Sequence, residues 1–200
     1  MKLTYKSMHG FLSQPAANTV GVLIYGPDHG MVRTRAKAIR TTLLGDAPDG
    51  FAYVQLDEEV LKDNPTRLNE ELCAISLMGG RRVIHLEVSS DKYAAVIEQA
   101  LVYANAENYL VVTAGEMPPR NKLRQCFEQL KNVAALPCYL EAGQNLARVV
   151  RTQLEQSGIR AHRDVVDYLT SELGNDHAVT LSELEKIALY KLGEDTLSLE

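Results

Sequence analysis

Residues 26–30 (GPDHG) form the segment of this chain where a phosphate group could bind. They follow a short apolar, β-branched run at 19–25 and precede a stretch with apolar residues at helical spacing, 31–44. Proteins of the α/β class bind nucleotides where a strand ends in glycine and leads into a helix, because helix N-terminal amides and the helix dipole favour anions. The order of these features predicts a nucleotide-type loop between a central strand and a helix.

The residues after this loop do not match a phosphate-binding loop. That pattern, G-x-x-x-x-G-K-[ST], uses the lysine to offset phosphate charge and the hydroxyl to hold magnesium. Counted from Gly26, the second glycine, lysine and hydroxyl positions hold Met31, Val32 and Arg33. We therefore interpret Gly26, Gly30, Met31, Val32 and Arg33 as a degenerate nucleotide loop, for which the alternative is a tight turn between strand and helix.

The remaining chemically competent side chains do not form a catalytic set. Asp28 adds an acid where phosphate would sit, and Glu87 is a single carboxylate at the end of an apolar strand. The five histidines lack the spacing of a metal-binding H-E-x-x-H motif, and the sequence has no G-x-S-x-G nucleophile motif. Arg33, Arg35 and Arg40 form a basic helix side that either contacts a phosphate or an acidic partner, or faces solvent. We predict no catalytic residues, no metal site and no cofactor.

Leu77 and Met78 are apolar residues that lie off the buried stripe of their predicted helix. That stripe is expected to contain Leu68, Leu72 and Ile75. At about 100° per residue, Leu77 lies about 180° from Leu68 around the helix. Two glycines at 79–80 then end the helix, which places Ser76, Leu77 and Met78 at its tip. The tip either anchors in a pocket of another protein, or bends at Ser76 so that both side chains tuck beneath the following strand.

These sites need elements that position them, and the chain alternates between strands and helices. Strands are predicted at 19–25, 51–56, 82–88, 109–114 and 134–140. Helices are predicted between them at 31–44, 65–78, 93–104 and 122–131. Because helices alternate with strands, the predicted fold class is α/β, with a mostly parallel five-stranded sheet flanked by helices.

Beyond residue 142 the strand pattern disappears. Three helices are expected there, at 145–156, 162–173 and 180–192. Each is followed by a glycine, which suits the left-handed conformation of a helix cap: Gly158, Gly174 and Gly193. We therefore predict an α/β domain at 1–142 and a small three-helix domain at 143–200.

Composition limits the classes of function. Of the 200 residues, 46% are hydrophobic and 24% are charged, so the chain can build a core and is neither disordered nor fibrous. The net charge of −5 argues against a protein that mainly binds nucleic-acid backbones by itself.

No apolar stretch is long enough to span a membrane, and the first residues lack the apolar core of a signal peptide, so a cytoplasmic location is expected. The three cysteines, without C-x-x-C spacing, predict buried thiols rather than disulfides or a zinc site, at Cys73, Cys126 and Cys138.

Several segments, in their order, resemble the delta subunit of the bacterial DNA polymerase III clamp loader. They are LIYGPDHGMVRTRAKAIR, NPTRLNEELCAISLMGGRRVIHLE, NYLVVTAGEMPPRNKLRQCFE, ALPCYLE and SELGNDHAVTLSELEKIALYKLG. The resemblance spans essentially the whole chain. It implies an AAA+-like fold, in which a RecA-like sheet domain is followed by a lid of three helices. It also implies a subunit of the polymerase holoenzyme without ATP hydrolysis of its own.

The resemblance further implies partners and a binding site. In this family an apolar pair at the end of the second helix inserts into the sliding clamp, the ring-shaped beta subunit. By position the pair is Leu77 and Met78, with Ser76 beside it, although family members usually carry an aromatic residue at the second position. The clamp is held open for loading onto primed DNA, and no membrane is involved. The ATPase and delta-prime subunits are contacted mainly through a C-terminal collar domain, which we expect to be absent here.

Two other interpretations remain open on the residues alone. The first is an atypical nucleotide-binding enzyme that uses residues 26–30, which the strand–glycine–helix order indicates. The second is a generic α/β protein-interaction module without a role in replication.

Overall fold

The computed structural model describes residues 1–45, 50–76, 79–105, 107–139, 144–173 and 176–199. The contacts between its residues divide the chain into two compact units. The first unit contains residues 1–27 and 32–138, and the second contains residues 28–31 and 139–200. The predicted domain boundary between residues 142 and 143 lies outside the described residues.

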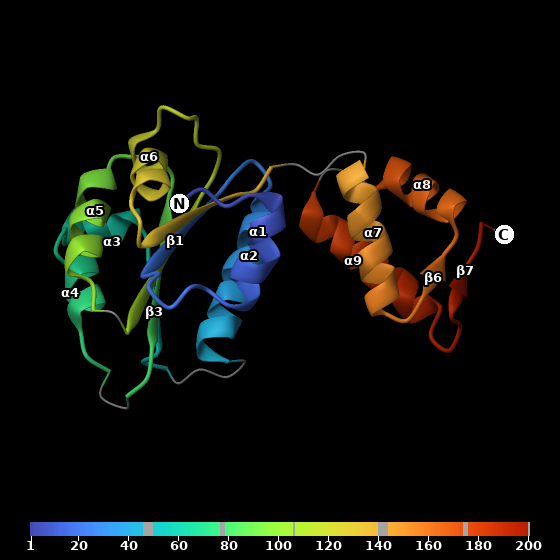
Figure 1. Ribbon diagram of the computed structural model, residues 1–200, viewed down its shortest axis with the longest axis horizontal. Helices are drawn as coiled ribbons and strands as arrows, with labels where there is room; N and C mark the ends of the chain where they lie inside the picture. Colours follow the sequence, from blue (N-terminus) through green and yellow to red (C-terminus); the bar gives the residue numbers. More distant parts are fainter. Residues whose placement is uncertain (46–49, 77–78, 106, 140–143, 174–175, 200) are drawn as a thin grey trace. The chain divides into compact units, whose positions relative to one another are not determined.

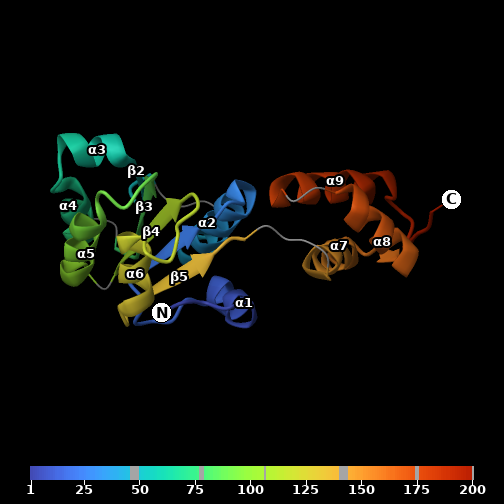
Figure 2. The same ribbon diagram turned by 90° about the horizontal axis from the view of Figure 1, so that it is seen from above.

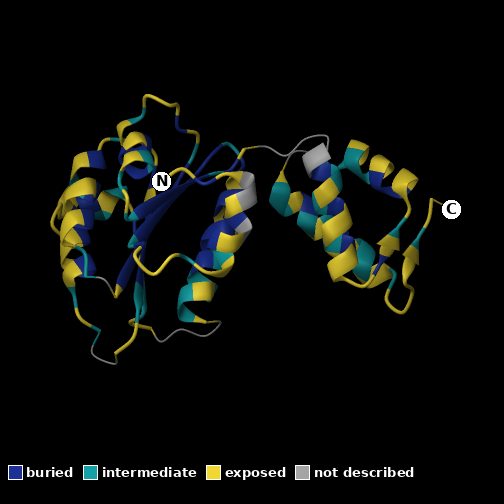
Figure 3. Cartoon of the chain, viewed as in Figure 1, coloured by how far each residue is buried: buried dark blue, intermediate teal, exposed yellow. Residues whose placement is uncertain are grey.

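The first unit is built on a five-stranded sheet in the order β2-β3-β4-β1-β5 (Figure 1, Figure 2). Its strands are β1 (Gly21–Tyr25), β2 (Tyr53–Leu56), β3 (Arg82–Val88), β4 (Asn108–Ala114) and β5 (Val133–Pro137). Every neighbouring pair is parallel, which confirms the predicted α/β sheet. All residues of β1 and β4 are buried, because helices cover both faces of the sheet (Figure 3). This burial explains why both strands consist almost entirely of apolar residues.

Helices cover the two faces of this sheet. In the described residues of the first unit they are α1 (Tyr5–Ser13), α2 (His29–Leu44), α3 (Glu58–Asp63), α4 (Arg67–Cys73), α5 (Ala94–Tyr103) and α6 (Lys122–Gln129). Helices α3 to α6 lie on one face, and α1 and α2 lie on the other (Figure 1). The core between the sheet and the first group includes Leu72 of α4, Ile97 of α5 and Phe127 of α6, all fully buried. This core holds α4 against the sheet.

The predicted helix at 65–78 is wrong in its length. Within that range only α4 forms, and it ends at Cys73, whereas α3 lies before residue 65 and was not predicted. Ala74 leaves the helix in an extended conformation, with φ −64° and ψ 145°. The first two residues of the predicted buried stripe are fully buried, but the third, Ile75, is 77% exposed. Ile75 lies beyond the helix, so helical periodicity does not apply to it.

Three smaller expectations also need correction. Helix α1 was not expected from the sequence, because its only buried apolar residues among those described are Met8 and Phe11. Strand β5 ends at Pro137, three residues earlier than predicted, although the Cys138 amide still donates to the Tyr25 carbonyl of β1. Cys73 is exposed because α4 ends there, whereas the other two thiols are buried as predicted.

The second unit is helical. It contains α7 (Gln144–Gln156), α8 (Arg163–Glu172), α9 (His177–Tyr190) and two short parallel strands, β6 (Arg160–Ala161) and β7 (Thr196–Leu197). Its three helices confirm the predicted three-helix segment, while the two-residue strands are too short to show a period in the sequence. The helices enclose a small apolar core of Leu146, Val150, Leu154, Ile159, Val166 and Leu184.

The described ranges contain neither a membrane-spanning helix nor a cluster of metal-binding side chains. Among those residues, no helix combines the length and apolar character needed to cross a bilayer. Nor do the same residues contain three or more His, Cys, Asp or Glu side chains arranged to hold a metal ion.

Candidate functional site

The loop after β1 is shaped by its close contact with β5. Gly26 has φ +153°, and a Cβ atom there would lie 1.9 Å from the carbonyl oxygen of Cys138. The Cys138 amide donates to the Tyr25 carbonyl at 2.6 Å, and the Gly26 amide donates to the Gly115 carbonyl at 3.1 Å. Because no side chain fits in this space, the packing of the sheet requires glycine at position 26 whether or not a ligand binds.

The N-terminus of α2 faces a carboxylate from its own chain. Asp28 is 2% exposed, and its Oδ1 accepts a hydrogen bond from the Met31 amide at 2.8 Å. In a phosphate-binding loop, amides in this position donate to the ligand. The Met31 amide is therefore not available to a ligand. In addition, the Asp28 carboxylate at the positive end of the helix dipole would repel a phosphate bound there.

Two of the three positions that bind phosphate and magnesium in a functional loop hold buried side chains here. Met31 and Val32 are buried, and their burial stabilises the fold by about 1.5–3 kcal/mol each. Gly30 is also buried, whereas Arg33 is exposed. The structure thus places three of the five predicted loop residues, Gly30, Met31 and Val32, in the buried start of α2, Gly26 directly after β1, and the Arg33 side chain toward solvent.

Arg35 was expected on a basic side of α2 together with Arg33 and Arg40. It is buried instead, and its Nη1 donates to the Pro137 carbonyl at 2.8 Å and to Cys138 Sγ at 3.3 Å. Arg35 therefore links α2 to the end of β5. A buried arginine with these partners is not available to a phosphate at the surface.

The connection between α4 and β3 carries the second candidate site. Ser76 Oγ donates to the Gly79 carbonyl at 2.9 Å, and the Gly79 amide donates to the Ser76 carbonyl at 3.3 Å. Gly79 and Gly80 have φ values of +74° and +81°, in the left-handed region that favours glycine. Leu77 and Met78 lie outside the described residues. Two hydrogen bonds thus join Ser76 and Gly79, the residues on either side of the pair.

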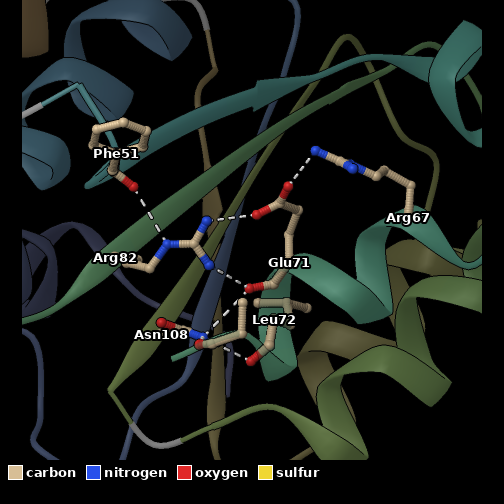
Figure 4. Close-up of polar contacts among 7 residues, drawn as sticks. Phe51, Arg67, Glu71, Leu72, Arg82 and Asn108 are labelled. Carbon is tan, nitrogen blue, oxygen red and sulfur yellow. Dashed lines mark hydrogen bonds and ion pairs between the residues drawn. The ribbon is translucent and has the colours of Figure 1, made fainter. Parts of the chain in front are cut away.

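A polar network anchors the end of α4 to the sheet (Figure 4). Asn108 is 2% exposed, and its Nδ2 donates to the carbonyls of Leu72 at 2.9 Å and Ala74 at 2.7 Å. Arg82 donates through Nη1 to the Glu71 carbonyl at 2.9 Å and pairs with the Glu71 carboxylate through Nη2. The last carbonyls of a helix have no partners within the helix. Side chains from β3 and β4 therefore supply the cap at this end of α4.

The two candidate sites lie at opposite edges of the sheet. Because the strands are parallel, the loop after β1 lies at their carboxyl edge and the turn before β3 lies at their amino edge (Figure 1). Phe51, which precedes β2, is also at the amino edge and is 79% exposed. Its carbonyl accepts a hydrogen bond from Arg82 Nε at 3.3 Å. Sequence reasoning missed Phe51 and Ile75 as exposed apolar side chains, since it assigned one to a strand and the other to a buried stripe.

His85 on β3 belongs to a polar row that crosses the sheet. Its Nδ1 lies 2.8 Å from the Tyr53 hydroxyl, and its Nε2 lies 2.8 Å from Thr113 Oγ1. Burial lowers the pKa of His85; the nearby Glu87 carboxylate opposes this shift, and the Arg40 guanidinium adds to it. A neutral imidazole with both nitrogens hydrogen-bonded joins three neighbouring strands, which is a structural role.

The parallel sheet, its strand order and the helical unit after it define an AAA+-like fold. The model of the family "DNA polymerase III, delta subunit" matches residues 22–139, and the chain belongs to this family. The resemblance found in the sequence is thereby confirmed.

Individual relatives agree with this assignment. The probable DNA polymerase III subunit delta of Rickettsia prowazekii is 21% identical over 176 residues, which are 84% of this chain and 50% of that protein. The Bacillus subtilis DNA clamp loader delta protein superposes with a TM-score of 0.69 at 12% identity, over 96% of this chain and 58% of that one. Domain III of the replication initiation protein DnaA from Thermotoga maritima superposes with a TM-score of 0.52 at 12% identity, over 98% of this chain and 86% of that one. The superpositions show a shared fold, and the chain spans about half the length of its curated relative.

Proposed function

We propose that this chain is the clamp-binding part of a clamp-loader delta subunit, which binds the ring-shaped sliding clamp and holds one of its interfaces open. The observation that carries the proposal is the end of α4, which is fixed to the sheet while Ile75, two residues beyond the helix, is exposed. Leu77 and Met78, with Ser76, are the proposed contacts. Burial of a leucine and a methionine contributes about 1.5–3 kcal/mol each, which suffices to anchor an interface when polar rim contacts assist.

In this proposal the chain needs no chemical step of its own. A subunit that binds the open clamp more tightly than the closed clamp shifts the ring toward the open form by that difference in affinity. ATP acts from the neighbouring subunits of the loader. The Asp28 carboxylate at the start of α2, together with the buried Met31 and Val32, supports a non-catalytic role. Contacts with the ATPase and delta-prime subunits and with primed DNA are proposed for the assembled loader, as the family implies.

The test is to replace Leu77 and Met78 together by serine and to measure binding to the purified sliding clamp encoded in the same genome. We expect the dissociation constant to rise at least about 100-fold, since two apolar anchors are lost. The matched control is the double substitution Leu189→Ser and Tyr190→Ser, which removes two strongly exposed apolar side chains from α9. The control should bind as the wild type does. Unchanged affinity of the first variant, with its fold intact, would remove the anchor role.

The two other interpretations predict different results. A nucleotide-binding enzyme that uses residues 26–30 would show micromolar affinity in a calorimetric titration with Mg-ATP, where we expect no binding heat. A protein-interaction module without a role in replication would fail to bind the clamp even with its wild-type sequence.

A further inference from the structure

The end of α4 has no cap in its own sequence. The helix ends at Cys73, and Ala74 is extended, whereas glycines with positive φ occur only further on, at 79–80. Helices often end with a left-handed glycine that satisfies their last carbonyls, and otherwise side chains or water must do so. The direction in which the chain leaves α4 is therefore not set by the residues of the turn alone.

Asn108, the first residue of β4, binds the carbonyls at this helix end. Its Nδ2 lies 2.7 Å from the Ala74 oxygen and 2.9 Å from the Leu72 oxygen, with the Glu71 oxygen at 3.4 Å. The Asn105 amide donates to the same Leu72 oxygen at 2.9 Å. A carboxamide nitrogen has two protons to donate, so Asn108 uses both on the carbonyls that flank the exit from the helix.

The neighbouring strand supports this arrangement. Arg82, the first residue of β3, is paired in register with Asn108 and donates to the Glu71 carbonyl at 2.9 Å. Two adjacent strands thus bind the final turn of α4 through their first side chains (Figure 4). The sheet, rather than the local sequence, fixes where the helix stops and where the next residues point, and the exposure of Ile75 follows from it.

We propose that Asn108 is the positioning residue of the clamp site. By holding the Leu72 and Ala74 carbonyls, it fixes the direction in which residues 74–76 leave α4 and so raises the affinity for the clamp of the segment into which they lead. A segment held in its binding direction loses less conformational freedom on association than one that is free to turn. This inference rests on the proposed function and assigns a role to a buried polar residue that does not touch the partner.

The direct test is Asn108→Ala, with Asn108→Asp as a variant of the same shape that has no donors. We expect the dissociation constant for the sliding clamp to rise about tenfold in both variants, because the exit from the helix is no longer fixed. The matched control is Thr113→Val, which removes a buried hydrogen bond to His85 at the other end of the same strand. The control should lose a similar amount of stability against urea and bind the clamp within twofold of the wild type. Equal weakening in the control, or unchanged affinity in both Asn108 variants, would overturn the proposal.

A second measurement does not depend on the clamp. Hydrogen exchange reports on the Asn105 and Gly79 amides, which donate to the Leu72 and Ser76 carbonyls. We expect both to exchange at least fivefold faster in Asn108→Ala but not in Thr113→Val, and unchanged exchange would overturn the positioning role. Faster exchange in a chain whose wild-type form does not bind the clamp would support positioning and overturn the proposed function. Should Asn108→Ala not fold, Asn108→Ser, which keeps one donor, permits the same comparison with an effect of about threefold.

Discussion

The loop after β1 and the turn before β3 are both glycine-containing connections at the edges of one parallel sheet, yet they leave different groups exposed. At the loop, the Asp28 carboxylate accepts a hydrogen bond from the Met31 amide, and the Met31 side chain is buried. At the turn, Asn108 satisfies the backbone carbonyls, while the neighbouring Ile75 remains exposed. A connection whose polar groups are hydrogen-bonded within the chain has few donors left to bind a phosphate. A connection that also exposes apolar side chains is suited to bind another protein.

The largest expected effect concerns Gly26 and tests whether the packing of the sheet requires glycine in this loop. Gly26→Ala places a Cβ atom 1.9 Å from the Cys138 carbonyl oxygen, so β1 and β5 must separate. We expect a loss of about 3 kcal/mol or more in the free energy of unfolding, measured with urea. Gly10→Ala in α1, where a Cβ atom meets nothing within 4 Å, is the control and should be neutral or stabilising. Equal stability of both variants would contradict the packing role.

The next effect concerns the support of the turn. Arg82→Met removes the ion pair with the mostly buried Glu71 carboxylate and leaves only Arg67 beside it. We expect a loss of about 2–3 kcal/mol in stability, because a buried charge loses a partner. Arg163→Met removes an ion pair whose partners are 90% and 66% exposed, and it should change stability by less than about 0.5 kcal/mol. Similar losses in the two variants would show that burial of the network is unimportant.

A smaller effect is expected at the start of α2. Asp28→Ala removes the acceptor of the Met31 amide, and we expect a loss of about 1 kcal/mol in stability. Asp57→Ala removes a comparable cap at the exposed start of α3, where Val60 donates at 3.0 Å, and it should cost less. Unfolding in urea measures both variants. We also expect Asp28→Ala not to bind Mg-ATP, because Met31 and Val32 still occupy the positions of the second glycine and the lysine. That result would separate the loop, which binds no ligand, from the turn more clearly.

The smallest effect is the pH dependence that His85 gives to the free energy of unfolding. Because burial lowers its pKa below the ordinary value of 6.5, the unfolded chain binds a proton more readily than the folded chain. The stability that His85 contributes is therefore fully present above pH 6.5 and is lost as the pH falls from there toward the lowered pKa. Urea unfolding at a series of pH values should show a steeper fall below this point in the wild type than in His85→Gln. Parallel curves would mean that His85 is protonated without cost in the folded chain.

The sequence predicts the sheet better than the end of α4, and the reason is physical. Buried parallel strands consist of apolar runs, so β3 was predicted with its observed bounds, 82–88. The end of α4 depends on Asn108, which is 36 residues from Leu72 along the chain. A local sequence pattern cannot predict a hydrogen bond between residues so far apart. The degenerate loop was visible in Met31 and Val32, whereas the role of Asp28 as an internal acceptor required the structure.

Strand β4 connects the two edges of the sheet physically. It begins at Asn108 beside the turn and ends at Ala114, next to the Gly115 carbonyl that accepts the Gly26 amide. All seven of its residues are buried, and close-packed interiors have low compressibility. A mechanical load applied at the amino edge is therefore transmitted along about 20 Å of stiff backbone instead of being absorbed by bending near its point of application. Rigidity against such a load is a property of the whole sheet and not of the few residues that receive it.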